Sequence, residues 1–305
     1  MTARLSLGPV LFNWPAEKWR DFHFRMADEA PVDTVHIGEV VCLKREVFFA
    51  PYLEEVAERY RRAGKELVFS SLALVVNARE AEAMAALAQA EDVLVEVNDM
   101  SVVPRLAGRP FVVGPTINVY NEGTLGYLEN LGAARVCPPP ELPRELILAL
   151  ARSARAELEV LSFGRLPLAL SARCFHARAA GLTKDGCRFV CGDDADGLEV
   201  KTLDGEPFVA INGTQVLSHA GVNLVSEVSD LVGLGIGRFR LSPHTLDMVR
   251  VAETFRDVLD GRLDTGSAMA ALSALTPRLP FANGFYRGGA GHRYLGEKTM
   301  GTGRL

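Results

Sequence analysis

Short apolar segments alternate with amphipathic segments along most of the chain. The apolar segments are rich in Val, Leu and Ile, which is typical of strands that are buried on both faces. In the segments between them apolar residues recur three and four positions apart, as in Leu53, Val56, Ala57 and Tyr60, and this spacing predicts helices with one buried face. The alternation is typical of βα units built around a parallel sheet.

Eight strands are predicted from this pattern. They are expected at residues 4–10, 33–37, 66–70, 92–97, 111–113, 134–137, 157–162 and 238–241. Helices are expected at residues 15–26, 51–63, 100–107, 121–131, 222–232 and 243–259, around Met84 and Leu87, and from Pro143 onward. Asn77 and Ser242 would cap two of them. Eight strands with helices between them predict an α/β protein of the (β/α)8, TIM-barrel-like class.

The alternation stops for about fifty residues after the seventh strand. Residues 163–220 are therefore expected to form an insertion within a single barrel-like domain that spans residues 1–305. Residues 262–305 contain many glycines and little periodicity, and an irregular C-terminal tail is expected there. No linker of low complexity divides the chain.

Composition excludes several classes of partner. The chain has 305 residues, of which 48% are hydrophobic, and a formal net charge of -5, with Lys and Arg dispersed along it. A nucleic-acid partner is not expected, because such proteins carry clustered positive charge. No apolar stretch reaches the roughly 18 residues of a membrane-spanning helix, and the apolar start of the chain ends at Gly8 and Pro9. The protein is expected to be cytoplasmic and not to span a membrane.

Four of the five cysteines predict a metal site. Cys174, Cys187 and Cys191 have the spacing C-x12-C-x3-C in the insertion, and Cys42 follows the second strand. Four thiolates suit tetrahedral zinc or a cubane iron–sulfur cluster, and the absence of C-x2-C pairs favours the cluster. Because loops that follow barrel strands lie at the same end of the barrel, the four cysteines could meet there.

Other interpretations of these residues stay open. Free cysteines are often small buried hydrophobes, and Cys137, at the end of a predicted strand, is interpreted in that way. His176 is expected to be exposed. Six polar residues at strand ends could line a pocket or simply cap loops: His36, Glu39, Asn77, Asn98, Asn118 and Ser162. Glu39 could also accept a proton or tune a nearby cluster. Catalytic residues are not identified.

Several motifs resemble those of a known family. They are Gly38-Glu39-Val40-Val41-Cys42, residues 164–175, the C-x12-C-x3-C run, Ile211-Asn212-Gly213-Thr214-Gln215, Arg240-Leu241-Ser242-Pro243 and Asn283-Gly284-Phe285-Tyr286. From about residue 4 to about residue 295 the chain resembles the collagenase-like peptidase family, and within it the branch that acts in oxygen-independent ubiquinone biosynthesis.

The resemblance implies a [4Fe-4S] cluster bound by Cys42, Cys174, Cys187 and Cys191. It also implies an enzyme, the subunit of an oxygen-independent hydroxylase that forms a heterodimer with a UbiU-like partner. The substrate would be the aromatic ring of a prenylated ubiquinone precursor, which a UbiT-like lipid-carrier protein could present. Two alternatives remain, namely a collagenase-like peptidase and a non-catalytic, zinc-stabilised module that binds a partner.

Overall fold

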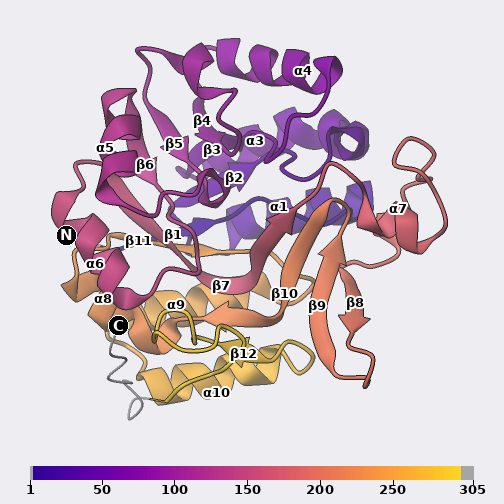
Figure 1. The fold of residues 1–305 in the computed structure, drawn as a ribbon. Helices are drawn as coiled ribbons and strands as arrows, with labels where there is room; N and C mark the ends of the chain where they lie inside the picture. Colours follow the sequence, from indigo (N-terminus) through magenta and orange to yellow (C-terminus); the bar gives the residue numbers. More distant parts are fainter. Residues whose placement is uncertain (1–2, 297–305) are drawn as a thin grey trace.

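Eight parallel strands form a closed barrel in the computed structural model, which describes residues 3–296 (Figure 1). The barrel closes because the last strand pairs with both the first and the seventh. The strands are β1 (Arg4–Leu7), β2 (Thr34–Ile37), β3 (Glu66–Ser70), β4 (Leu94–Val97), β5 (Phe111–Val113), β6 (Ala133–Val136), β7 (Glu157–Leu170) and β11 (Arg238–Leu241). The predicted fold class and all eight predicted strands are confirmed.

Helices surround the barrel and bury the outward-facing strand residues. The longer helices are α1 (Ala16–Asp28), α3 (Leu53–Arg62), α4 (Ala78–Gln89), α5 (Glu122–Asn130), α6 (Arg144–Ser153), α8 (Val228–Gly233), α9 (Met248–Leu259) and α10 (Thr265–Leu275). Short helices are α2 (Glu46–Phe49), α7 (Phe175–Ala179) and the 3-10 turns η1 (Leu43–Arg45), η2 (Ala50–Tyr52), η3 (Val103–Leu106), η4 (Pro115–Ile117), η5 (Val190–Gly192) and η6 (Val225–Glu227). Asn77 caps α4 as predicted, since its side chain accepts a hydrogen bond from the Glu80 N–H.

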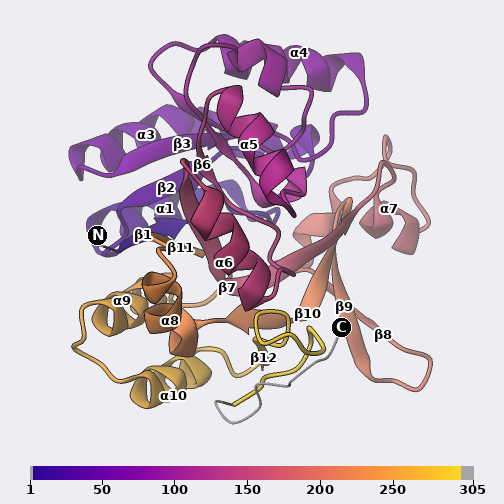
Figure 2. The ribbon, with the colours of Figure 1, turned by 60° about the vertical axis from the view of Figure 1, so that its left-hand side comes forward.

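The seventh strand extends beyond the barrel. The second half of β7 pairs antiparallel with β10 (Gln215–Asn223), which continues to β9 (Pro207–Asn212) and β8 (Leu198–Lys201), while β12 (Phe281–Ala282) pairs with β10. Gly164 lies at this transition with a φ of 107°, and a Cβ there would lie 2.7 Å from the Cβ of Ser242. Figures 1 and 2 show β8, β9 and α7 together at one side of the barrel. The segment that carries three cysteines therefore projects from the C-terminal end of β7.

Three predicted helices are wrong in their bounds. Residues 222 and 223 belong to β10, so that the helix expected at 222–232 begins only at Val228. The last barrel helix begins at Met248 and not at residue 243, because the Ser242 N–H bonds the Phe163 carbonyl and Asp247 provides the cap. The helix expected at 100–107 is only a 3-10 turn. In the first two cases, contacts between distant segments outweigh local preference.

The expected irregular C-terminal tail is also wrong for residues 265–275. These residues form α10, which Asp264 caps by accepting a hydrogen bond from the Ser267 N–H. Ala268 and Leu272 are buried in the hydrophobic core that α9 shares. Packing of this face stabilises a helix whose own periodicity is weak. Residues 297–305 lie outside the described residues.

Candidate functional site

Four of the five cysteines line one cavity of about 350 Å³, part of which is open to solvent. Cys187 and Cys191 are buried, whereas Cys42 and Cys174 are partly exposed. Cys137 does not line this cavity. It follows β6 and is fully buried, and burial raises its pKa to about 12. The tertiary structure thus gathers the four cysteines that the sequence grouped and separates the fifth from them.

The loop after β2 presents Cys42. Gly38 begins this loop with a φ of 119°, and a Cβ there would lie 2.8 Å from the Ser70 carbonyl oxygen, so that the turn requires glycine. The Glu39 carboxylate then accepts hydrogen bonds from the backbone N–H groups of Val41 (2.7 Å) and Cys42 (2.8 Å). Burial raises the pKa of Glu39. Its position shows that Glu39 holds the cysteine loop in shape.

The insertion presents the other three cysteines on short turns. Cys174 caps α7, and its Sγ lies 3.5 Å from the Ala177 N–H nitrogen. Arg188 and Phe189, between the last two cysteines, have φ angles of 48° and 55°, in the left-handed region that costs energy for residues other than glycine. Strained backbone of this kind is concentrated at functional sites.

Lys44 fastens the insertion to the β2 loop. Its Nζ donates hydrogen bonds to the carbonyl oxygens of Lys184 (2.8 Å) and Asp185 (3.0 Å) and lies 3.7 Å from the Cys187 Sγ. The rings of Phe48 and Phe189 also meet edge to face across this contact, with centroids 4.7 Å apart. Donors near sulfur are a feature of tuned metal–thiolate sites.

Four cysteines at one cavity are a donor set whose chemistry fits a metal–thiolate group. Among residues 3–296, no group of three or more His, Cys, Asp or Glu side chains is arranged to hold a metal ion. A zinc ion would need all four sulfurs at about 2.3 Å from one point. An iron–sulfur cluster instead binds its thiolates at separate iron atoms, so that its ligands need not meet at one point. Four thiols that line one cavity, three of them with an N–H donor beside the sulfur, suit such ligation.

His176 is buried at 3% exposure, so that the expectation of an exposed side chain is wrong. Its Nδ1 accepts a hydrogen bond from the Gly213 N–H at 2.8 Å, and its Nε2 lies 3.1 Å from the Asp194 Oδ2. The histidine therefore ties α7 to the turn between β9 and β10. Only the packing of these distant segments produces the burial.

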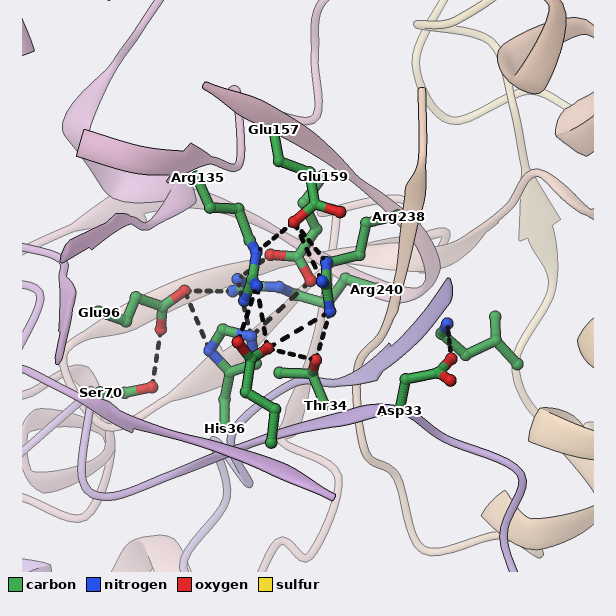
Figure 3. Close-up of polar contacts among 12 residues, drawn as sticks. Asp33, Thr34, His36, Ser70, Glu96, Arg135, Glu157, Glu159, Arg238 and Arg240 are labelled. Carbon is green, nitrogen blue, oxygen red and sulfur yellow. Dashed lines mark hydrogen bonds and ion pairs between the residues drawn. The ribbon is translucent and has the colours of Figure 1, made fainter. Parts of the chain in front are cut away.

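A second polar cluster fills the barrel interior (Figure 3). The Arg240 guanidinium pairs with Glu96 at 2.5 Å and with Glu159 at 2.6 Å. His36 lies between the two carboxylates, at 3.5 Å from Glu96 and 3.7 Å from Glu159. A neighbouring layer contains Thr34, Glu66, Arg135, Glu157 and Arg238. Since side chains alternate along a strand, these residues point inward while Phe239 and its equivalents pack outward.

The charges in this cluster keep both carboxylates ionised. Burial by itself raises the pKa of Glu96, but Arg240 and His36 outweigh burial and the pKa lies below its usual range. The same balance holds the pKa of Glu159 well below its usual range. The two carboxylates therefore stabilise the fold wherever they are ionised.

Acid is expected to remove this stabilisation. The pKa of Glu96 is lower in the folded than in the unfolded chain, so its contribution is present above about pH 4.3 and is lost as the pH falls further. Glu96→Gln should therefore be less stable than the wild type near neutral pH, and the difference should shrink below about pH 4. Urea unfolding across this range measures it, with Glu54→Gln, whose side chain is 88% exposed, as control. A difference that is independent of pH would contradict the expectation.

A pocket of about 440 Å³, part of it open to solvent, lies at the barrel mouth. Its polar lining consists of Glu96, Asn98, Thr116, Arg165, Gln215, Arg240 and Ser242. The Arg165 Nη1 donates to the carbonyl oxygens of Ser218 and His219, and within residues 3–296 no carboxylate lies within ion-pair distance of it. Burial lowers the pKa of Arg165. Barrel enzymes build their active sites at this end.

The cysteine cavity and the mouth pocket are neighbours. Val40 lines the pocket and Cys42, two residues later, lines the cavity. On the insertion side, Gln215 lines the pocket and Thr214 lines the cavity. The Thr214 hydroxyl donates to the Val41 carbonyl at 3.0 Å, which joins the two segments. One thin wall therefore separates the two sites.

The six polar residues at strand ends have different positions. Asn98 lines the mouth pocket and donates to Glu96, while His36 lies in the barrel interior. Asn77 caps a helix, Asn118 ends η4 in the left-handed region, and the Ser162 hydroxyl donates to the Val160 carbonyl.

Sequence reasoning missed Arg45, Glu96, Glu159, Arg165 and Arg240. The signal for Glu96, Glu159 and Arg240 was available, because a charge inside an otherwise apolar parallel strand is unusual.

Comparison with known sequences places the chain in a family. Residues 20–295 match the sequence profile of Peptidase family U32. The chain belongs to this family. A solved structure of the U32 peptidase Mk0906 is similar at 15% identity over 80% of this chain and 94% of that chain, with a TM-score of 0.44. A tryptophan synthase complex from Pyrococcus furiosus is similar at 13% identity over 91% of this chain and 100% of that chain, with a TM-score of 0.40.

The hydrogen bonds of the histidines in residues 3–296 bear on one common type of peptidase site. Within the described residues, no Ser, Thr or Cys side chain is hydrogen-bonded to a histidine, which is the usual arrangement of an activated nucleophile. The same residues include no helix with the length and apolar character that crossing a bilayer requires. Family membership therefore establishes ancestry, while the chemistry must be argued from the site.

Proposed function

We propose that this chain is the iron–sulfur subunit of an oxygen-independent hydroxylase of ubiquinone biosynthesis, the role of UbiV within the collagenase-like peptidase family. The observation that carries the proposal is the meeting of Cys42 with Cys174, Cys187 and Cys191 at one cavity. These cysteines would hold a [4Fe-4S] cluster, which supplies one-electron chemistry when bound. The motif resemblance supports the more specific role.

The mouth pocket would hold the group that reacts. Its lining includes the paired charges of Glu96 and Arg240 and the amides of Asn98 and Gln215. Such groups can orient a small polar molecule and exclude water around it. The pocket is adjacent to the cysteine cavity, so that a molecule bound there would lie close to an electron source.

The aromatic substrate and the partners follow from the motif resemblance. A UbiU-like protein would complete a heterodimer in the cytoplasm, and a UbiT-like lipid carrier would present the prenylated precursor. If the two subunits produced together without oxygen elute as separate monomers, the heterodimer is excluded. Gelatin cleavage by the iron-loaded protein would instead support a peptidase.

Iron and sulfide analysis tests the cofactor. Protein purified and reconstituted without oxygen is expected to contain about four iron and four sulfide per chain and to absorb broadly in the visible range. Exposure to air should bleach this absorption, because part of the cavity is open to solvent. Metal analysis that finds zinc, whose thiolate complexes are colourless, would instead support a zinc-stabilised module. Colourless protein without iron would refute the proposal.

A further inference from the structure

Arg45 is a buried cation at the wall of the cysteine cavity. It ends η1, three residues after Cys42, and only 2% of it is exposed. Within the described part of the chain, no acidic side chain lies within ion-pair distance of its guanidinium. Buried charges are normally paired, because the loss of hydration is costly. Arg45 therefore lacks a counter-charge in contact with it.

Neutral groups hold the Arg45 guanidinium in place. Its Nη1 donates to the Leu11 carbonyl at 2.8 Å and its Nη2 donates to the Asn212 side-chain oxygen at 3.0 Å, while Nε has no partner. A Cβ on Gly213 would lie 2.5 Å from Nη2, so that the glycine makes room for the guanidinium. These contacts fix the position of the charge but do not neutralise it.

This cation lines the same cavity as the four cysteines. The charge of the guanidinium interacts with Glu39, Cys191 and Cys42. The Asn13 amide nitrogen lies 3.6 Å from the same Cys191 sulfur. A four-thiolate site accumulates negative charge, which the buried cation at its wall would offset.

We propose that Arg45 is a positioning residue that supplies the buried counter-charge of the four-cysteine site and raises the reduction potential of the cluster bound there. The inference rests on the proposed function, because it requires the cluster. Reduction adds one negative charge to the site, and a fixed cation nearby stabilises the reduced form more than the oxidised form. Where water is excluded this attraction is strong.

Two lysines near the cavity should affect the reduction potential less than Arg45 does. Lys44 and Lys184 are partly exposed, and solvent and salt screen their charges. Arg45 cannot be reached by solvent in the same way and cannot lose its proton at ordinary pH. Its removal should therefore change the potential more than removal of either lysine.

The test measures the midpoint potential of full-length, anaerobically reconstituted protein by redox titration, together with iron per chain. Arg45→Gln is expected to lower the potential so that the reduction equilibrium shifts by about tenfold, equivalent to 59 mV for one electron. Arg45→Lys, which keeps the charge, should recover most of the shift. Arg62→Gln, whose side chain is 77% exposed on α3, should have no effect. Full iron content with an unchanged potential in Arg45→Gln would overturn the inference.

A second variant tests the inference in case Arg45→Gln does not retain the cluster. Asn212→Asp keeps an acceptor for the Arg45 Nη2 but adds a carboxylate that neutralises the guanidinium, and it should lower the potential in the same direction. An unchanged potential in iron-loaded Asn212→Asp would overturn the inference. If neither Arg45→Gln nor Asn212→Asp retains iron, the iron content of Arg45→Lys decides. Full iron in Arg45→Lys would support a requirement for the positive charge. Loss of iron in Arg45→Lys would show that the shape of the arginine matters and would overturn the inference. Wild-type protein that binds no cluster would refute the proposed function instead.

Discussion

Replacement of Cys42, Cys174, Cys187 or Cys191 by alanine, one at a time, is expected to remove most of the iron from protein reconstituted without oxygen. Each change leaves one iron of the cluster without its thiolate, and the four cysteines line one cavity with no spare thiol beside them among the described residues. Metal binding and the order of the surrounding loops are coupled, so the loss should exceed one iron per chain. Iron content should fall from about four to below about one.

Cys137→Ala is the matched control. This cysteine is fully buried behind β6 and does not line the cavity, so that its replacement should cost about 1 kcal/mol of stability and leave the iron content unchanged. Iron and sulfide per chain in all five single variants decide the assignment. Full iron in the Cys42 variant would remove that residue from the ligand set, and loss of iron in the Cys137 variant would place the metal elsewhere.

Arg240→Met is expected to cause the largest loss of stability. The change leaves Glu96 and Glu159 buried in the barrel without the guanidinium that pairs with both of them. Removal of one partner from a buried ion pair costs about 3–5 kcal/mol. With an unfolding entropy of about 2.1 cal/mol/K per residue, the melting temperature of this 305-residue chain should fall by roughly 5–8 °C. Thermal unfolding near neutral pH, followed by circular dichroism, measures the effect.

In Arg240→Met, the loss of stability due to charge can be separated from the loss due to packing. Methionine retains much of the apolar volume of the arginine stem, so that a deficit due to charge should shrink in acid, where the carboxylates become neutral. Arg62→Met, at an exposed position, should change stability by less than about 0.5 kcal/mol. An Arg240→Met variant as stable as the wild type would show that the interior network does not hold the barrel together.

The charged side chains in its interior distinguish this barrel from most barrels of the same class. Most such barrels fill their centre with layers of branched aliphatic side chains. Here Arg135, Arg238 and Arg240 occupy inward positions together with glutamates. A buried ion pair seldom adds stability compared with well-packed apolar residues. The upper layer, formed around Arg240, opens into the mouth pocket, which connects these charges with a binding role.

The amino-acid sequence by itself determined the barrel class and the set of grouped cysteines. A parallel strand that is covered on both faces must be apolar, and a surrounding helix must repeat its apolar residues every three to four positions, so both appear as local patterns. The spacing of Cys174, Cys187 and Cys191 is likewise readable along the chain. The role of these cysteines as ligands stays a prediction.

Only the tertiary structure decided the features that depend on contacts between distant segments. Burial of His176 requires the turn at Gly213, and the isolated charge of Arg45 requires the carbonyl of Leu11 and the side chain of Asn212. The late start of α9 and the stability of α10 depend in the same way on neighbouring strands and helices. Local preference contains no information about such partners, because their energies arise only when the chain has brought them together.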